Sequence, residues 1–191
     1  MITGIILASA SPRREQLLRQ VGCDFRVEAS QAEENNAAAL PPAELVRRHA
    51  LAKAQAVAAK APAGEIVIGA DTIVTLTGKV YGKPTDAPAA IEMLQELSGQ
   101  THSVWSGVAV VVADRSFTAA VETQVTLARL TPDQIRRYVA TGEPLDKAGA
   151  SAVQGRGALF VERLEGCYFN VVGLPLQTLS QLLAQAGVEL L

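Results

Sequence analysis

The chain of 191 residues is long enough to bury one substantial core and too short for two full domains, so a single domain over residues 1–191 is expected, with room for two lobes. Apolar residues make up 49% and charged residues 19%, which excludes a largely disordered protein. The net charge of −2 argues against general electrostatic binding of nucleic acid, so no nucleic-acid partner is expected.

The first element is a short apolar run, Ile5 to Ala8, which is typical of a buried strand. It is too short for a signal peptide, and no run in the chain reaches the roughly 18 apolar residues of a membrane span. We therefore predict a cytoplasmic protein with no membrane partner. A helix then begins with Ser11 as N-cap and Pro12 at the first helical position, and it ends at Gly22.

The middle of the chain alternates strands and helices. Residues 25–29 read as a second strand, and an Ala-rich helix of about 17 residues follows Pro42, with Lys53 beside its apolar face. Residues 66–74 give the strongest strand signal in the chain, and Asp71 lies inside it.

The second half adds hairpins and more helices. The pattern predicts a helix from Asp86 to Leu97, β-rich stretches over 104–112 and 118–127, a helix from Thr131 to Gly142, a loop over 143–157, a strand near 158–161, an extended piece near 169–172 and a helix over about 175–186. Crossover helices together with hairpins indicate an α/β fold with a mixed twisted sheet and flanking helices.

Two arginines occupy an electrostatically unfavourable position. Arg13 and Arg14 lie in the first turn of the first helix, where the helix dipole and free N–H groups already make the field positive. A bound phosphate would reverse this, because it accepts from the N–H groups, the serine hydroxyls and both guanidinium groups. Both side chains pointing into water is the alternative.

Asp71 is a carboxylate inside an apolar strand and so needs a cation, a metal or a set of hydrogen-bond donors. A structural carboxylate, a metal ligand and a general base for water are all open. The adjacent Glu33 and Glu34 suit either a solvated loop or a Mg²⁺ site.

Other residues carry weaker signals. Lys53 and Lys83 are ordinary surface lysines unless a ligand uses them, although Pro84 favours an extended backbone at Lys83. His49 and His102 have no partner at zinc-site spacing, and this favours structural or surface roles. The chain lacks the Gly-x-Ser-x-Gly, Gly-x-Gly-x-x-Gly and Walker motifs, which counts against the common hydrolase, dinucleotide and ATPase classes.

Eight segments in a fixed order resemble the Maf family of nucleoside triphosphate pyrophosphatases, once described as septum-formation inhibitors. They are residues 7–14 (LASASPRR), 53–54 (KA), 69–72 (GADT), 82–84 (GKP), 97–102 (LSGQTH), 142–149 (GEPLDKAG), 153–155 (VQG) and 173–176 (GLPL). Each segment alone is a weak signal, whereas the ordered set is specific and spans nearly the whole chain.

The resemblance implies an ITPase-like α/β fold with two lobes around a central cleft, a divalent cation (Mg²⁺ or Mn²⁺) and a homodimer. It also implies that Asp71 is the proton acceptor and that Glu34, with Asp71, serves the metal. The residues that match the family's phosphate pocket are Ser9, Ser11, Arg13, Arg14, Lys53 and Lys83.

Base preference depends on a few positions within the resemblance. Asp71-Thr72 and Gln154-Gly155 are similar to the members that hydrolyse dTTP and UTP, so Arg13, Thr72 and Gln154 are expected to determine specificity. An amide at Gln154 can both donate to and accept from a pyrimidine edge. Ser151 stands where the family usually has Tyr, and this could change affinity or base choice.

The expected activity is hydrolysis of dTTP and UTP, or of modified pyrimidine nucleotides, to the nucleoside monophosphate and pyrophosphate. One alternative is a nucleotide-binding regulator of cell division that acts through a protein partner. A phosphosugar-binding enzyme is another, but it explains only the helix-end arginines.

Overall fold

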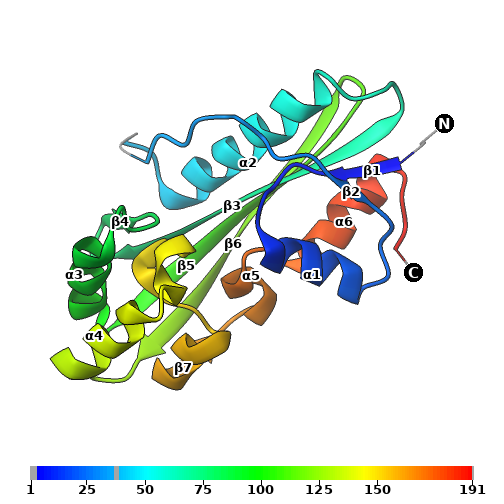
Figure 1. Ribbon diagram of the computed structural model, residues 1–191. Coiled ribbons are helices and arrows are strands. Elements are labelled where there is room, and N and C mark those ends of the chain that lie inside the picture. Colours follow the sequence, from blue (N-terminus) through cyan, green and yellow to red (C-terminus); the bar gives the residue numbers. More distant parts are fainter. Residues whose placement is uncertain (1–3, 37–38, 191) are drawn as a thin grey trace. The chain divides into compact units, whose positions relative to one another are not determined.

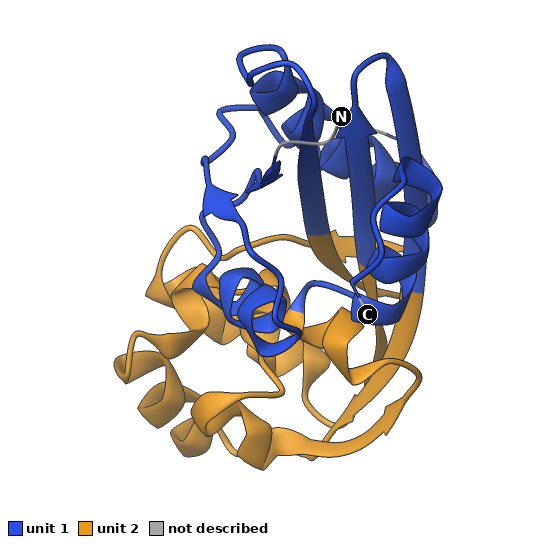
Figure 2. Ribbon diagram, turned by 90° about the vertical axis from the view of Figure 1, so that its right-hand side faces the viewer, with its two compact units in different colours: residues 1–71, 106–121, 173–191 blue, residues 72–105, 122–172 orange. Residues whose placement is uncertain are grey.

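The computed structural model describes residues 4–36 and 39–190. The chain divides into two compact units: unit 1 contains residues up to 71, 106–121 and 173 onward, and unit 2 contains residues 72–105 and 122–172 (Figure 2). Whether they make up a single domain over 1–191 stays a prediction, as does the absence of a signal peptide, since residues 1–3 lie outside these ranges. Among the described helices, none has the length and apolar character needed to cross a bilayer.

The strands form one mixed sheet, as the sequence predicted. Within the described residues they are β1 (Gly4–Leu7), β2 (Arg26–Val27), β3 (Glu65–Leu76), β4 (Lys79–Tyr81), β5 (Thr101–Val112), β6 (Arg115–Leu127) and β7 (Val161–Glu165). The order is β2-β1-β3-β5-β6-β7, with β4 paired to β3. β1 is parallel to both β2 and β3, whereas β4 and β7 are antiparallel to β3 and β6.

The helices are α1 (Pro12–Gln20), α2 (Pro42–Ala58), α3 (Ala87–Leu97), α4 (Pro132–Ala140), α5 (Tyr168–Val172) and α6 (Leu176–Ala186), with short 3₁₀ turns η1 (Glu143–Asp146), η2 (Ala148–Ala150) and η3 (Gly155–Phe160). Local side-chain chemistry explains where several of these helices begin. The side chain of Asp86 accepts from the backbone N–H of Ala89 at 2.8 Å and so caps the start of α3. Thr131 and Gln134 form a capping box at α4.

In unit 1, α2 packs directly on the sheet (Figure 1). Small and branched side chains make this contact, because Ile6 and its strand partner Val67 form one cluster with Ala50 and Ala54 of the helix. The backbones nearly touch: a Cβ added at Gly69 would lie 2.1 Å from the carbonyl oxygen of Ala50. No side chain fits there, so α2 is held at close range from β3.

In unit 2, α3 and α4 pack on each other and on the strands. Leu94 of α3 and Ile135 and Tyr138 of α4 share one buried cluster. A second cluster joins Leu97 to side chains of β3, β5 and β6. Apolar side chains of both helices thus bury the core of this unit.

Three local predictions were wrong. The strand near 158–161 is the end of η3, and β7 begins only at Val161, because a carboxylate at Glu143 binds the backbone N–H groups of Arg156 and Gly157 and fixes a turn there. The extended piece over 169–172 is the helix α5, where tertiary contacts of Asn170 override the strand preference of two valines. β2 covers only two of the five residues expected.

Candidate active site

Asp71 lies on β3 and faces α2. Successive side chains of a strand alternate between faces, so Val67, Gly69 and Asp71 share the face on which α2 packs. Asp71 is 3% exposed. Its Oδ1 accepts from Nζ of Lys53 at 2.7 Å, and its Oδ2 accepts from Nδ1 of His49 at 2.9 Å. Both oxygens of this buried carboxylate are therefore held by donors from one helix.

Lys53 is shared between two carboxylates. Its Nζ lies 2.7 Å from Asp71 Oδ1 and 2.5 Å from Glu34 Oε1, and it also reaches the carbonyl oxygen of Ala70 at 3.5 Å. Lys53 is buried, whereas the Glu34 side chain is 41% exposed. One ammonium group thus joins a buried acid to an acid that solvent can reach.

Arg14 is turned inward at the start of α1. Its Nη1 donates to Ser9 Oγ at 3.1 Å and to the Ala70 carbonyl oxygen at 2.9 Å, and its Nε donates to the Gly173 carbonyl oxygen at 2.8 Å. The side chain is 9% exposed. The structure therefore brings this predicted phosphate-site residue against the backbone of β3 next to Asp71.

The neighbouring residues of the turn are arranged differently. Ser11 occupies the N-cap position, as predicted, but its side chain makes no capping bond in the part of the chain that the structure describes. Its backbone N–H donates to Ser9 Oγ at 3.2 Å. Arg13 is partly exposed. Ser9, Ser11, Arg13 and Arg14 thus gather at one helix end, with Arg14 buried in the protein.

The charged groups of this cluster shift one another's pKa. Burial by itself raises the pKa of the Asp71 carboxyl, but the hydrogen bond from His49 and the charges of Lys53 and Arg14 hold that pKa well below its usual range. Burial lowers the pKa of Arg14, and the nearby Asp71 and Glu34 partly offset this. Asp71 is ionised at neutral pH.

The other predicted residues belong to unit 2. Thr72 follows Asp71 directly on β3 and is partly buried, Lys83 is exposed after β4, and Gln154 precedes η3. The cluster inside unit 1 accordingly contains Ser9, Ser11, Arg13, Arg14, Glu34, Lys53 and Asp71 and none of these three.

Glu143 fixes the backbone next to Gln154. Its carboxylate accepts from the N–H of Gly157 at 3.0 Å, the N–H of Arg156 at 3.1 Å and the hydroxyl of Tyr138 at 3.1 Å. A Cβ at Gly155 would lie 2.8 Å from this carboxylate, and the residue has a φ of +65°, so glycine is required there. The Gln154 segment therefore has a defined backbone.

His49 is the residue that the sequence did not identify. The absence of zinc-site spacing favoured a structural or surface role, yet the structure places its ring against Asp71. A signal was available: His49 precedes Lys53 by four residues on a predicted helix, so both side chains share one face.

The acidic residues fit a divalent cation in part. Glu34 and Asp71 already converge on one positive charge, and Mg²⁺ in proteins is usually held by one or two carboxylates together with substrate phosphates and water. Among the described residues there is no group of three or more His, Cys, Asp or Glu that could hold a metal alone. The donor set therefore suits a cation that arrives with a phosphate ligand.

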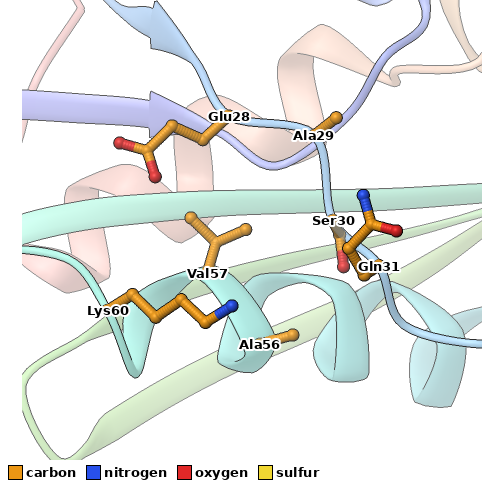
Figure 3. Close-up of a pocket in the computed structure, with 7 residues that line it drawn as sticks. All are labelled: Glu28, Ala29, Ser30, Gln31, Ala56, Val57 and Lys60. Carbon is orange, nitrogen blue, oxygen red and sulfur yellow. The ribbon is translucent and has the colours of Figure 1, made fainter.

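A separate hollow of about 200 Å³ lies between residues 28–31 and the C-terminal part of α2 (Figure 3). Glu28 and Lys60 line it, with Val57 at its base, and it contains none of the predicted site residues. Its opposite charges do not converge on a common point in Figure 3. We assign it no role.

The fold and the cluster define an α/β protein with a buried acid flanked by cations. The sequence profile of the family described as Maf-like protein matches residues 4–186. The dTTP/UTP pyrophosphatase of Moorella thermoacetica is 54% identical over 97% of this chain and 96% of its own length, and that of Gloeobacter violaceus is 51% identical over 97% of each chain. The chain belongs to the Maf family.

A solved structure shows a weaker similarity. The Staphylococcus aureus Ham1 protein shares 17% identity and covers 66% of this chain and 72% of its own, with a TM-score of 0.48. That score is too low to define the fold here, so the mixed α/β sheet rests on the strands and helices described above.

Proposed function

We propose that this protein hydrolyses dTTP and UTP to the nucleoside monophosphate and pyrophosphate. The observation that carries the proposal is the convergence of Asp71 and Glu34 on Lys53, next to the buried Arg14. Relatives about 50% identical over nearly the whole chain bear the name dTTP/UTP pyrophosphatase, and this supports the choice of reaction and substrate.

In this proposal the triphosphate binds at the start of α1. The positive field of the helix end would attract the phosphate groups, and the hydroxyls of Ser9 and Ser11 and the guanidinium of Arg13 would donate hydrogen bonds to the phosphate oxygens. Arg14 holds the turn to β3 and adds its charge. Lys53 adds a further positive charge in unit 1, and Lys83 of unit 2 stays a predicted phosphate-binding residue.

Asp71 then acts as the base. It takes a proton from a water molecule as the water oxygen bonds to the α-phosphorus, and the bond to the bridging oxygen breaks so that pyrophosphate leaves. Lys53 Nζ donates to Oδ1 of Asp71 at 2.7 Å. A triphosphate would compete for that ammonium group and free the oxygen for water.

We assign the divalent cation to Glu34 and Asp71, with Mg²⁺ or Mn²⁺ as the ion. When bound, the cation supplies positive charge that stabilises the phosphate oxygens during transfer. Base preference is assigned to Arg13, Thr72 and Gln154. The amide of Gln154 can match both donors and acceptors of a pyrimidine, and Glu143 keeps its backbone in place.

The test is pyrophosphate release from a panel of dTTP, UTP, dCTP, ATP, GTP and 7-methyl-GTP, with Mg²⁺, Mn²⁺ or excess chelator. We expect dTTP and UTP to have the highest kcat/KM and the chelator to abolish turnover. Binding of a triphosphate without hydrolysis would contradict the proposal and favour a regulator. The homodimer and the cytoplasmic location stay predictions, for size measurement and fractionation to test.

A further inference from the structure

The buried His49 makes a hydrogen bond whose direction is determined. It is 5% exposed, and its Nδ1 lies 2.9 Å from Asp71 Oδ2. An ionised carboxylate can only accept hydrogen bonds, and the ammonium group of Lys53, 2.7 Å from the other oxygen of Asp71, favours the ionised form. The hydrogen therefore sits on Nδ1, and His49 is the donor.

This donor is mounted on a rigid support. His49 and Lys53 stand one turn apart on α2, and the backbone of that helix lies against two glycines of the sheet. A Cβ at Gly69 would lie 2.1 Å from the Ala50 carbonyl oxygen, and one at Gly107 would lie 2.1 Å from the Val46 carbonyl oxygen. Contacts this close fix the distance between the imidazole and β3.

The two donors on Asp71 differ in the other groups that can bind them. Lys53 is a flexible cation that also binds Glu34, and a triphosphate or a metal ion would change its partners. His49 contacts the other oxygen, through a flat ring buried beside the helix backbone. The bond from His49 can therefore persist when Lys53 moves to an anion.

We propose that His49 is a positioning residue for the catalytic base: its Nδ1–H fixes Oδ2 of Asp71 and thereby turns Oδ1 toward the attacking water. The proposal rests on the proposed function of Asp71. It needs only a donor at the Nδ1 position, and so it predicts which replacements will work.

The experiment compares three substitutions in the full-length protein. An Asn side chain can put its amide N–H where Nδ1 lies, a Gln amide lies closer to the Nε2 position, and Leu has no donor. We would measure kcat and KM for dTTP with Mg²⁺ in H49N, H49Q and H49L, alongside melting temperatures. Arg48→Asn, at the exposed neighbour on α2, is the matched control.

We expect H49L to lower kcat by on the order of 10- to 100-fold, as the loss of a hydrogen bond to a charged group does, with KM changed less than about threefold. H49N should keep most of the wild-type kcat, whereas H49Q should not. If H49L fails to fold, the contrast between H49N and H49Q carries the test.

Two results would overturn the proposal. One is a kcat in H49L equal to that of the wild type, and the other is an equal loss in H49N and H49Q, which would give the ring a role other than donation from Nδ1. A wild-type protein that hydrolyses no triphosphate would instead refute the proposed function itself.

Discussion

Asp71 in unit 1 and Glu143 in unit 2 are both carboxylates that accept several hydrogen bonds, but their donors differ. The donors on Asp71 are the side chains of His49 and Lys53, whereas those on Glu143 are two backbone N–H groups and a tyrosine hydroxyl. Backbone donors move only with the chain, while a lysine can change partners. This difference fits the proposed roles, with Asp71 as the catalytic base and Glu143 as part of the scaffold.

The largest effect should come from Asp71→Asn. The amide keeps the shape but cannot take a proton, so we expect kcat to fall on the order of 10³-fold while the protein stays folded. Pyrophosphate release and circular dichroism measure the two parts. A variant with near-normal turnover would show that Asp71 is not the base, and the contrast with Glu143 would disappear.

Next in size is Gly69→Ala, which tests the support of the cluster. The new Cβ would meet backbone of α2, which cannot move aside as a side-chain tip can, so we expect a loss of about 3 kcal/mol in the free energy of unfolding. Turnover should fall as well, because the helix carries His49 and Lys53.

Gly4→Ala is the control for that substitution. A Cβ there lies 3.3 Å from the carboxylate end of Glu65, which can shift at little cost. Denaturant unfolding of both variants gives the comparison. Equal stability of the two would contradict the close packing of α2 on β3.

A pH titration of stability should separate the units. Burial lowers the pKa of His102 in unit 2 to about 4, and its Nδ1 has no partner among the described residues. In the unfolded chain the His102 imidazole takes up a proton near pH 6.5, whereas in the folded chain it does so only near pH 4. The free energy of unfolding therefore falls as pH drops from 6.5 toward 4, by about 2 kcal/mol down to pH 4.5.

Asp71 contributes to the pH dependence of stability in a different pH range. Its folded pKa is depressed, so its stabilisation is complete above the unfolded pKa of roughly 3.9 and is lost only as pH falls below that. His102→Leu should therefore flatten the stability profile between pH 6.5 and 4.5 and leave it unchanged above pH 7.5. The same slope in wild type and variant would contradict a buried neutral His102.

The smallest effect should come from Glu143→Gln. The amide N–H₂ would face a backbone N–H, which costs about 1 kcal/mol in the free energy of unfolding. We expect kcat for dTTP to fall less than about tenfold, with a larger change in the ratio of kcat/KM between dTTP and dCTP, because Gln154 adjoins this bond. A loss of kcat as large as that of Asp71→Asn would place Glu143 in the chemistry.

The sequence predicted most helices because their boundaries carry local signals. Pro12, Pro42, Asp86 and Thr131 stand at helix starts, where their backbone or side-chain chemistry is favoured independently of the rest of the fold. The error at α5 has the opposite cause: Val171 and Val172 favour a strand locally, while the buried amide of Asn170 finds its partners only in the folded unit.

The sequence by itself determined the α/β class, the order of the elements and a candidate acid in a buried strand, since these follow from periodicity, capping and the cost of burying charge. Only the tertiary structure decided that His49 and Lys53 meet Asp71, that Lys53 also binds Glu34, and that Arg14 turns inward to the carbonyl groups of Ala70 and Gly173. These partners are separated by between 18 and 159 residues in the chain, and no local pattern reports such distances.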